Sequence, residues 1–198
     1  MNSLFLSALL AVSPLIGLNE TDWSPALQKT VTVNREAVTL FRFAHRDGSN
    51  NHLYGEHLSL ILDQNHRLKG FVRLEAVGAR QDLPAREEAQ KISDVFLRQV
   101  APDLLQNRKI LWIEPHDEVI QINEDGKRRS LTLTGMKVKS RNTKTGLYFW
   151  TIVNADRQVY VFERDIKWIV FPGKRGTEKW LHDAWLDEQW GGKLPISE

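Results

Sequence analysis

Histidine is concentrated in one short segment that also contains two carboxylates, namely His45, Asp47, His52, Glu56 and His57. Imidazole and carboxylate groups are ligands that Zn²⁺ and Cu²⁺ bind in proteins. If residues 46–51 form the loop of a hairpin, His45 and His52 lie nearly opposite each other across its two strands. His52 and His57 then point to opposite faces of a regular strand, so all three share a metal only if Gly55 marks a bulge. The segment predicts either a metal site at these histidines or a set of solvated hairpin residues.

A second group of acidic and basic side chains occupies residues 114–118, with the sequence EPHDE. A hydrolase would use His116 together with Asp117 or Glu118. Proline and the high charge density favour a simpler interpretation, in which the segment is an exposed turn between two strands.

Other signs of catalysis are scarce. His182 and Asp183 are adjacent on a predicted helix and do not face each other, which indicates solvated surface residues. The sequence contains no Gly-x-Ser-x-Gly elbow, P-loop, Gly-x-Gly-x-x-Gly or His-Glu-x-x-His motif. We therefore expect a protein that is not an enzyme and that needs no cofactor.

Three basic residues, Lys137, Lys139 and Arg141, alternate along a predicted strand and share one of its faces. Such a row predicts an anionic partner, such as an acidic protein surface or lipid headgroups. The alternative is a solvated face, or a strand edge that lysine protects against aggregation. No aromatic residues are interleaved with the row, which argues against single-stranded nucleic acid.

Tryptophan is concentrated in the last quarter of the chain, at Trp150, Trp168, Trp180, Trp185 and Trp190. The first two lie in strand-like sequence, and we expect them in the core. Trp185 and Trp190 lie near the chain end, where exposed indoles would form a partner-binding surface or a ligand cleft.

These side chains require strands to position them. Runs of β-branched and aromatic residues predict strands that begin near residue 31 and continue at 38–43, 58–62, 70–77, 109–113, 118–122, 130–140, 147–153 and 159–171. Short connections between strands indicate antiparallel pairing. Apolar residues occupy odd positions before Gly135 and even positions after it, which predicts a bulge at that glycine.

The clearest predicted helix follows Pro84. Its apolar residues recur every three or four positions on one face, at Ala85, Ala89, Ile92, Phe96 and Val100. A shorter helix after Thr177 carries Trp180 and Trp185 on its apolar side and ends at Gly191-Gly192. One apolar stripe on each helix is what a helix lying on a sheet requires.

Composition bounds the class of protein. The 198 residues carry a formal net charge of +2, too small by itself to imply nucleic acid or an anionic membrane. There is no cysteine, which excludes disulfides, thiolate metal sites and a cysteine nucleophile. Residues 3–18 are almost wholly apolar and resemble the central region of a signal peptide. The alternatives for residues 1–18 are a docked apolar helix and an uncleaved anchor.

The segments 87–92 (EEAQKI), 96–97, 146–156 and 159–162 together resemble a PepSY-type domain of exported bacterial proteins, over roughly residues 84–166. Such units open with a helix and end with a strand pair whose turn carries Asp and usually Gly. Here Arg157 and Gln158 stand where that glycine is expected. The resemblance implies an extracytoplasmic, non-catalytic module that binds or regulates another protein.

Together these observations predict an α+β protein in which an antiparallel β-sheet packs against one long helix, with a short C-terminal helix. A single domain would span 29–190, or two packed subunits would span 29–78 and 84–171, followed by the tail 191–198. The predicted function is that of a periplasmic or secreted, non-enzymatic module. It would engage another protein of the cell envelope near the membrane, and not nucleic acid. Its expected partner-binding residues are Lys137, Lys139, Arg141, Trp185 and Trp190. The alternative is a periplasmic carrier of a small ligand or metal.

Overall fold

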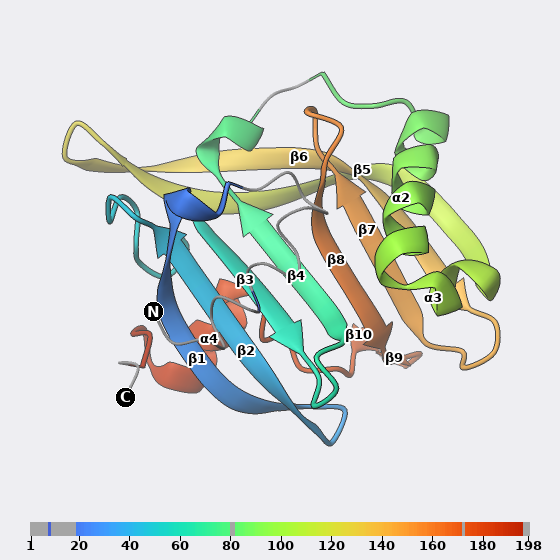
Figure 1. The fold of residues 1–198 in the computed structure, drawn as a ribbon. Coiled ribbons are helices and arrows are strands. Elements are labelled where there is room, and N and C mark those ends of the chain that lie inside the picture. Colours follow the sequence, from blue (N-terminus) through green and yellow to red (C-terminus); the bar gives the residue numbers. More distant parts are fainter. Residues whose placement is uncertain (1–7, 9–18, 80–81, 172, 196–198) are drawn as a thin grey trace.

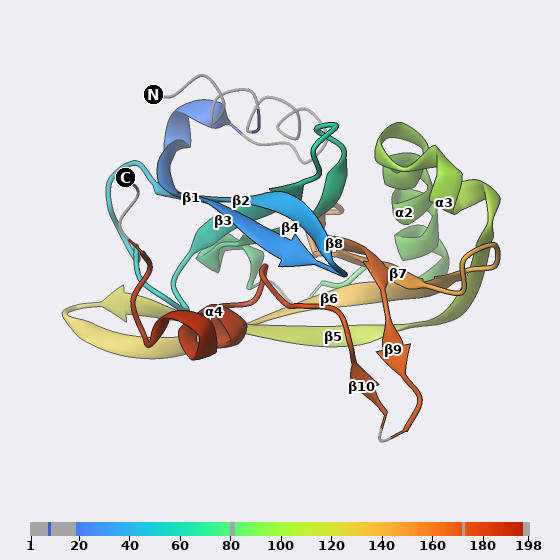
Figure 2. The same cartoon turned by 90° about the horizontal axis from the view of Figure 1, so that it is seen from below.

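The protein is α+β, with an eight-stranded antiparallel sheet between two helical elements (Figure 1). The computed structural model describes Ala8 and residues 19–79, 82–171 and 173–195. The long helix α2 (Arg86–Val100) packs on one face of the sheet, and the short α4 (Asp183–Trp190) lies on the other (Figure 2). The predicted fold class is thus confirmed.

The sheet consists of two four-stranded meanders joined by their last strands. In order along the chain the strands are β1 (Trp23–Val33), β2 (Glu36–His45), β3 (His57–Leu62), β4 (Leu68–Leu74), β5 (Arg108–Glu124), β6 (Lys127–Asn142), β7 (Tyr148–Val153) and β8 (Val159–Ile166). Their order across the sheet is β1-β2-β3-β4-β8-β7-β6-β5. Pairing of β4 with β8, with Gly70 opposite Glu163, joins the two halves.

Both edge strands contain a proline. Pro25 lies in β1, and Pro115 lies in β5 opposite Met136. Proline has no N–H to donate and is tolerated where one side of a strand has no neighbour. The expected turn at 114–118 is wrong, because β5 runs through it as one strand.

The parity change in β6 has a different cause from the predicted bulge. The β5–β6 register is continuous at Gly135 and shifts between Ile110 and Trp112 instead. Leu133 belongs to the apolar cluster on the α4 face, whereas Val138 belongs to the cluster under α2. Successive residues of a strand point to opposite faces, so the apolar parity changes where coverage passes from one face to the other.

The helices differ in how closely they follow the sequence pattern. In α2, Ala89 and Phe96 are buried and Ile92 packs against the same cluster, as the predicted stripe requires. The expected start of the last helix at Thr177 is wrong, because α4 begins at Asp183.

Three short helical segments lie in the connections between strands and helices. They are the 3₁₀ segments η1 (Glu20–Asp22) and η2 (Ala76–Gly78) and the short helix α3 (Pro102–Gln106).

Segment 177–182 lies flat on the sheet. Thr177 is buried and accepts a hydrogen bond from the Lys167 N–H at 2.8 Å. Leu181 packs over Gly70, where an added Cβ would come within 2.9 Å of Leu181 Cδ1 and 2.8 Å of the Phe162 carbonyl oxygen. A glycine in β4 thus allows the chain to approach the sheet before α4 begins.

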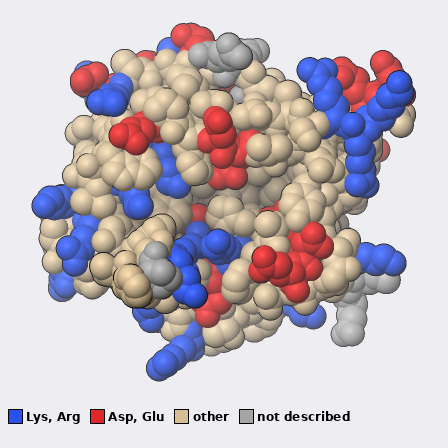
Figure 3. Space-filling model, turned by 180° about the vertical axis from the view of Figure 1, so that it is seen from behind, with Lys and Arg blue, Asp and Glu red and all other residues tan. Residues whose placement is uncertain are grey.

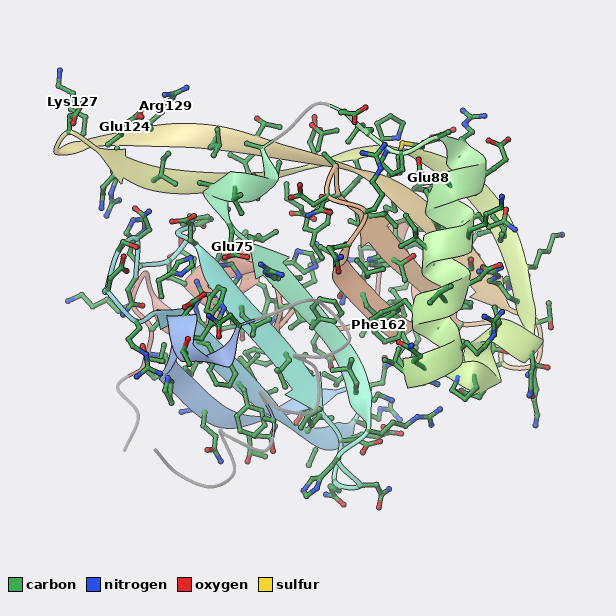
Figure 4. All side chains as sticks on the ribbon, turned by 45° about the horizontal axis from the view of Figure 1, so that its top comes forward. Glu75, Glu88, Glu124, Lys127, Arg129 and Phe162 are labelled. Carbon is green, nitrogen blue, oxygen red and sulfur yellow. The ribbon has the colours of Figure 1, made fainter. Side chains whose placement is uncertain are left out.

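The predicted hairpin of 147–153 and 159–171 is confirmed up to Ile166. Beyond it the chain leaves the sheet, and β9 (Trp168–Ile169) pairs with β10 (Lys174–Arg175) in a separate, projecting hairpin (Figure 2). In the turn between β7 and β8, Arg157 has a φ of 60°. Its Nε donates to Glu88 Oε1 of α2 at 3.1 Å (Glu88 is labelled in Figure 4), and this contact holds the turn to the helix.

Of residues 1–18 the structure describes only Ala8, which is buried in the cluster under α2. The predicted signal peptide or apolar helix otherwise lies outside the described residues. Within the described part of the chain, no helix is both long and apolar enough to cross a bilayer.

Candidate functional site

A cleft of about 560 Å³ opens on the face of the sheet opposite α2. Its floor is formed by β5–β8, and its walls are the β9–β10 hairpin and the segment from Lys179 to Glu188. The lining side chains are mostly charged or aromatic: His116, Glu118, Lys137, Trp150, Glu163, Trp168, Lys174, Arg175, Lys179, His182, Ala184, Trp185 and Glu188. Figure 3 looks onto this face and shows a hollow near its middle, at which basic and acidic atoms meet. We call it the aromatic–basic cleft.

Two lysines of β6 lie over indole rings in this region. Lys137 Nζ is 4.4 Å from the centroid of Trp150, and Lys139 Nζ is 4.6 Å from that of Trp168 and 5.2 Å from that of Trp112. The electron-rich face of an indole attracts a cation. Burial lowers the pKa of both lysines. Neither takes part in any ion pair that the described residues form.

A buried carboxylate lies in the floor of the cleft. Glu163 is 3% exposed, and its oxygens lie 2.6 Å from Arg175 Nη2 and 3.0 Å from His182 Nε2. Burial alone would raise the pKa of Glu163, but the two cations outweigh it and hold that pKa below the ordinary value. Burial opposes the charge of His182 as well, yet Glu163 raises the pKa of His182. Glu163 therefore keeps its charge at neutral pH and favours the protonated form of His182. We call Glu163, Arg175 and His182 the open cluster.

A second buried cluster forms around Asp183, the residue that follows His182 in the chain. Asp183 accepts two hydrogen bonds from Arg42, at 2.6 and 2.9 Å, and a third from the backbone N–H of Tyr54. His57 Nδ1 lies 3.8 Å from the same carboxylate, and Arg42 is 2% exposed. We call Arg42, Asp183 and His57 the sealed cluster. The expectation that His182 and Asp183 are merely solvated is wrong, since each anchors the start of α4 to the sheet.

The three histidines of the proposed metal site have separate environments. His45 stacks on Trp23 with ring centroids 4.5 Å apart, and His57 is buried with Nδ1 2.9 Å from the Gly55 carbonyl oxygen. His52 is not opposite His45 as expected, because β2 ends at His45 and β3 begins only at His57. Among the described residues, no three His, Asp or Glu side chains are placed to hold one metal ion.

The acid–base segment is split between the two faces of β5. His116 and Glu118 line the aromatic–basic cleft, with His116 Nε2 3.4 Å from Glu118 Oε1. Asp117 points the other way and accepts a hydrogen bond from the Thr134 hydroxyl at 2.7 Å. A hydrolytic pair of His116 and Asp117 is therefore not assembled, whereas His116 and Glu118 share the cleft with Lys137.

The predicted partner-binding residues divide into two groups. Lys137, Lys139 and Trp185 belong to the cleft or its edge. Arg141 is exposed beyond it, and its Nε donates to the Gly146 carbonyl oxygen. Trp190 lies outside the lining and packs on Trp180, with ring centroids 5.7 Å apart.

The predictions for the remaining aromatic residues have mixed outcomes. Trp150 is 5% exposed, as a core residue should be, but Trp168 is 38% exposed on the projecting hairpin, so its predicted core position is wrong. The lysine row has aromatic neighbours after all, because Trp112, Tyr148 and Trp168 surround Lys139. These rings come from β5, β7 and β9, so the sequence of β6 alone does not show them.

Sequence reasoning missed Arg42, Glu163 and Arg175. Only Arg42 carries a signal, because it is a single charge between Phe41 and Phe43 in an apolar run, whereas Glu163 is followed by Arg164 and Asp165. A buried charge is expensive unless it is paired. A lone charge in such a run therefore predicts a distant counter-ion, although not which one.

Comparison of the chain with models of protein families, with curated proteins and with solved structures found no match. The resemblance to PepSY-like domains thus stays a prediction, as do the predicted domain boundaries. The site has to be interpreted from its own geometry.

Proposed function

We propose that this protein is a non-enzymatic binding module whose aromatic–basic cleft holds an anionic ligand against indole faces. The observation that carries the proposal is the pair Lys137 and Lys139, which lie over Trp150 and Trp168 and form no ion pair among the described residues. Glu163 and Glu118 favour the charge of Lys137 from a distance, but no carboxylate of the described residues lies within ion-pair distance of either lysine, so an anionic ligand could approach both.

The charge balance of the cleft supports an anion. Four basic side chains line it, Lys137, Lys174, Arg175 and Lys179, against three carboxylates, Glu118, Glu163 and Glu188. His182 adds positive charge when it is protonated, and Glu163 favours that form because it raises the pKa of His182. Burial disfavours the charged form of these lysines, and a bound anion would favour it.

The aromatic walls support a ligand with a flat, apolar part. Trp150, Trp168 and Trp185 come from three different elements and line one space. Trp185 Nε1 is buried without a hydrogen-bond partner in the described structure, so an acceptor on the ligand would satisfy it. Small organic carboxylates, sulfonates or sugar acids with one planar or ring-shaped face have this combination.

Binding accounts for the cleft better than catalysis does. Its most buried acid, Glu163, is committed to Arg175 and His182 and keeps its charge well below neutral pH. A general acid or base works best with a pKa near the operating pH. The lysines, by contrast, offer positive charge that an anionic ligand can neutralise.

A second candidate is an acidic segment of another protein. It is favoured by the basic row, because the row continues beyond the cleft to exposed Arg141 on β6. This second candidate agrees with the sequence-based prediction of a protein partner at the cell envelope. The expected periplasmic or secreted location stays a prediction, which the N-terminus of the native mature protein, determined by mass spectrometry, would test.

The test is a titration followed by tryptophan fluorescence and calorimetry, with aromatic carboxylates, sulfonates and sugar acids and their uncharged amides or alcohols. We expect saturable binding of anions only. The variant Lys137→Met should weaken it about tenfold, as loss of one charged contact does. The matched control is Lys127→Met at the far end of the same strand, labelled at the tip of β6 in Figure 4, and it should bind as the wild type does.

Equal affinities of the Lys137→Met and Lys127→Met variants would contradict the cleft as the site. Saturable binding of a poly-glutamate peptide, lost in Arg141→Met but without binding of small anions, would favour the second candidate. If neither ligand type binds, both candidate functions are wrong.

A further inference from the structure

The β9–β10 hairpin is a firmly held projection and not a loose loop. Trp168 pairs with Arg175 and Ile169 with Lys174, and the Gly176 N–H donates to the Lys167 carbonyl oxygen at 2.9 Å. At its base, Arg175 is tied to buried Glu163. Figure 2 shows the hairpin extending away from the body of the protein on the side of α4.

The apex of this projection is apolar. Phe171 is 91% exposed and Val170 is 88% exposed, and both values exceed those of all other exposed large apolar residues that the structure describes. Ile169, next to them, is 44% exposed. We call Ile169, Val170 and Phe171 the apolar tip. Single exposed apolar residues need no explanation, but three in succession at the end of a projection do.

The flanks of the apolar tip are basic. Lys167 and Lys174 precede and follow it, and both are exposed. Residues 167–176, with the sequence KWIVFPGKRG, contain no acidic residue. Trp168 lies between the tip and the body, and Lys139 Nζ lies over its ring, 4.6 Å from the centroid. Val170 and Phe171 thus form the apex, Lys174 lies level with Ile169, and Trp168 and Lys167 lie nearer the body.

We propose that the apolar tip inserts into the interface of an anionic lipid bilayer while Lys167 and Lys174 contact the headgroups. The order of groups along the hairpin matches the depth profile of a membrane surface, where apolar side chains lie deepest and indole and lysine side chains lie at headgroup level. Anionic headgroups complement the two lysines. This inference does not depend on a ligand in the cleft.

The experiment is sedimentation of the full chain with vesicles of phosphatidylcholine alone and of phosphatidylcholine mixed with phosphatidylglycerol. We expect the wild type to partition onto the mixed vesicles. Val170→Ser together with Phe171→Ser should lower the partition coefficient tenfold or more, because the buried apolar area is lost. Lys167→Gln with Lys174→Gln should lower it about tenfold on mixed vesicles and little on neutral ones.

The matched control removes two exposed apolar residues elsewhere, with Val95→Ser on α2 and Val119→Ser on β5, which are 53% and 56% exposed. This control and the cleft variant Lys137→Met should partition as the wild type does. Circular dichroism of each variant verifies the fold. Equal partitioning of the tip variant and its control, or no partitioning of the wild type onto mixed vesicles, would overturn the proposal, and capture of a protein through the tip instead would do the same.

Discussion

His182 and Asp183 are neighbours in the chain, yet their side chains enter two ion clusters that differ in their access to solvent. In the sealed cluster, Asp183 and Arg42 are 6% and 2% exposed at their side chains, and α4 and the loop at Tyr54 cover them. In the open cluster, His182 is 28% exposed and Glu163 forms part of the floor of the cleft. Both clusters attach the start of α4 to the sheet.

The two clusters attach the same end of α4, but they differ in what they contribute to the protein. A pair that is shut off from water has no substitute partner when one member is lost, so the sealed cluster acts on stability. The open cluster is bordered by a space that water or a ligand enters, so its charges also shape the electrostatics of the cleft. Stability measurements and ligand titrations should therefore respond differently to matched changes in the two clusters.

The largest expected effect is that of Asp183→Asn. It leaves buried Arg42 without a counter-ion, and breaking a buried pair in this way costs about 3–5 kcal/mol. Urea denaturation should show this loss in the free energy of unfolding, with the midpoint shifted accordingly. A loss below about 1 kcal/mol would mean that solvent reaches Arg42 and that the cluster is not sealed.

The sealed cluster should also make stability depend on pH through His57. Burial and the Arg42 charge lower the pKa of His57 to about 4, against the opposing effects of Asp183 and the Gly55 carbonyl. Below pH 6.5 the unfolded chain binds a proton that the folded chain refuses, so stability falls as the pH falls from 6.5 towards 4. The loss amounts to about 3 kcal/mol for a shift of this size.

His182 contributes with the opposite sign. The raised pKa of His182 stabilises the folded state at a pH below the pKa of the unfolded chain, and this stabilisation is lost as the pH rises through the pKa of the folded state.

Because His182 also titrates, the measurement for His57 is the difference in unfolding free energy between the wild type and His57→Gln, determined by urea denaturation from pH 7 to 4. A constant difference over that range would show that His57 is not held neutral.

A smaller effect is expected from Glu163→Gln in the open cluster. Arg175 keeps hydrogen bonds to the carbonyl oxygens of Thr177 and Glu178, and the cleft gives its charge some solvation. We expect a loss of about 1–3 kcal/mol, less than for Asp183→Asn. The pKa of His182, followed by NMR, should fall in this variant and stay raised in Asp183→Asn. A fall of the His182 pKa in both variants would mean that the two clusters are one coupled unit.

The smallest effect serves as the reference for both clusters. Glu124 and Arg129 form an ion pair at the tip of the β5–β6 hairpin (Figure 4), with side chains 55% and 62% exposed. Replacing Glu124 by Ala should change the free energy of unfolding by less than about 0.5 kcal/mol, as is usual for an exposed pair. Differential scanning calorimetry should show no resolved change in the melting temperature. A larger change would show that the overhanging hairpin contributes to the folded core.

The parts of the fold that follow a local rule were predictable. The stripe of Ala89 and Phe96 defines the buried side of α2, and two runs of β-branched and aromatic residues around a polar turn define the β7–β8 hairpin. The segment 114–118 misled because proline and charge also occur in turns, and only the pairing of β5 with β6 supplies the hydrogen bonds that keep it extended. Trp168 misled because an aromatic in a strand-like run is usually buried, whereas here the strand leaves the sheet after Ile166.

The sequence by itself determined the α+β class, the long helix and the face on which Lys137 and Lys139 lie, because these depend on periodicity along a single element. Tertiary structure alone decided that Arg42 meets Asp183, 141 residues away, and that Glu163 meets His182 and Arg175. A local pattern can show that a charge lies in apolar surroundings, but its counter-ion is set by which distant segment packs against it. The cleft exists because α2 covers one face of β5–β8 while the other face is only bordered by α4 and the β9–β10 hairpin.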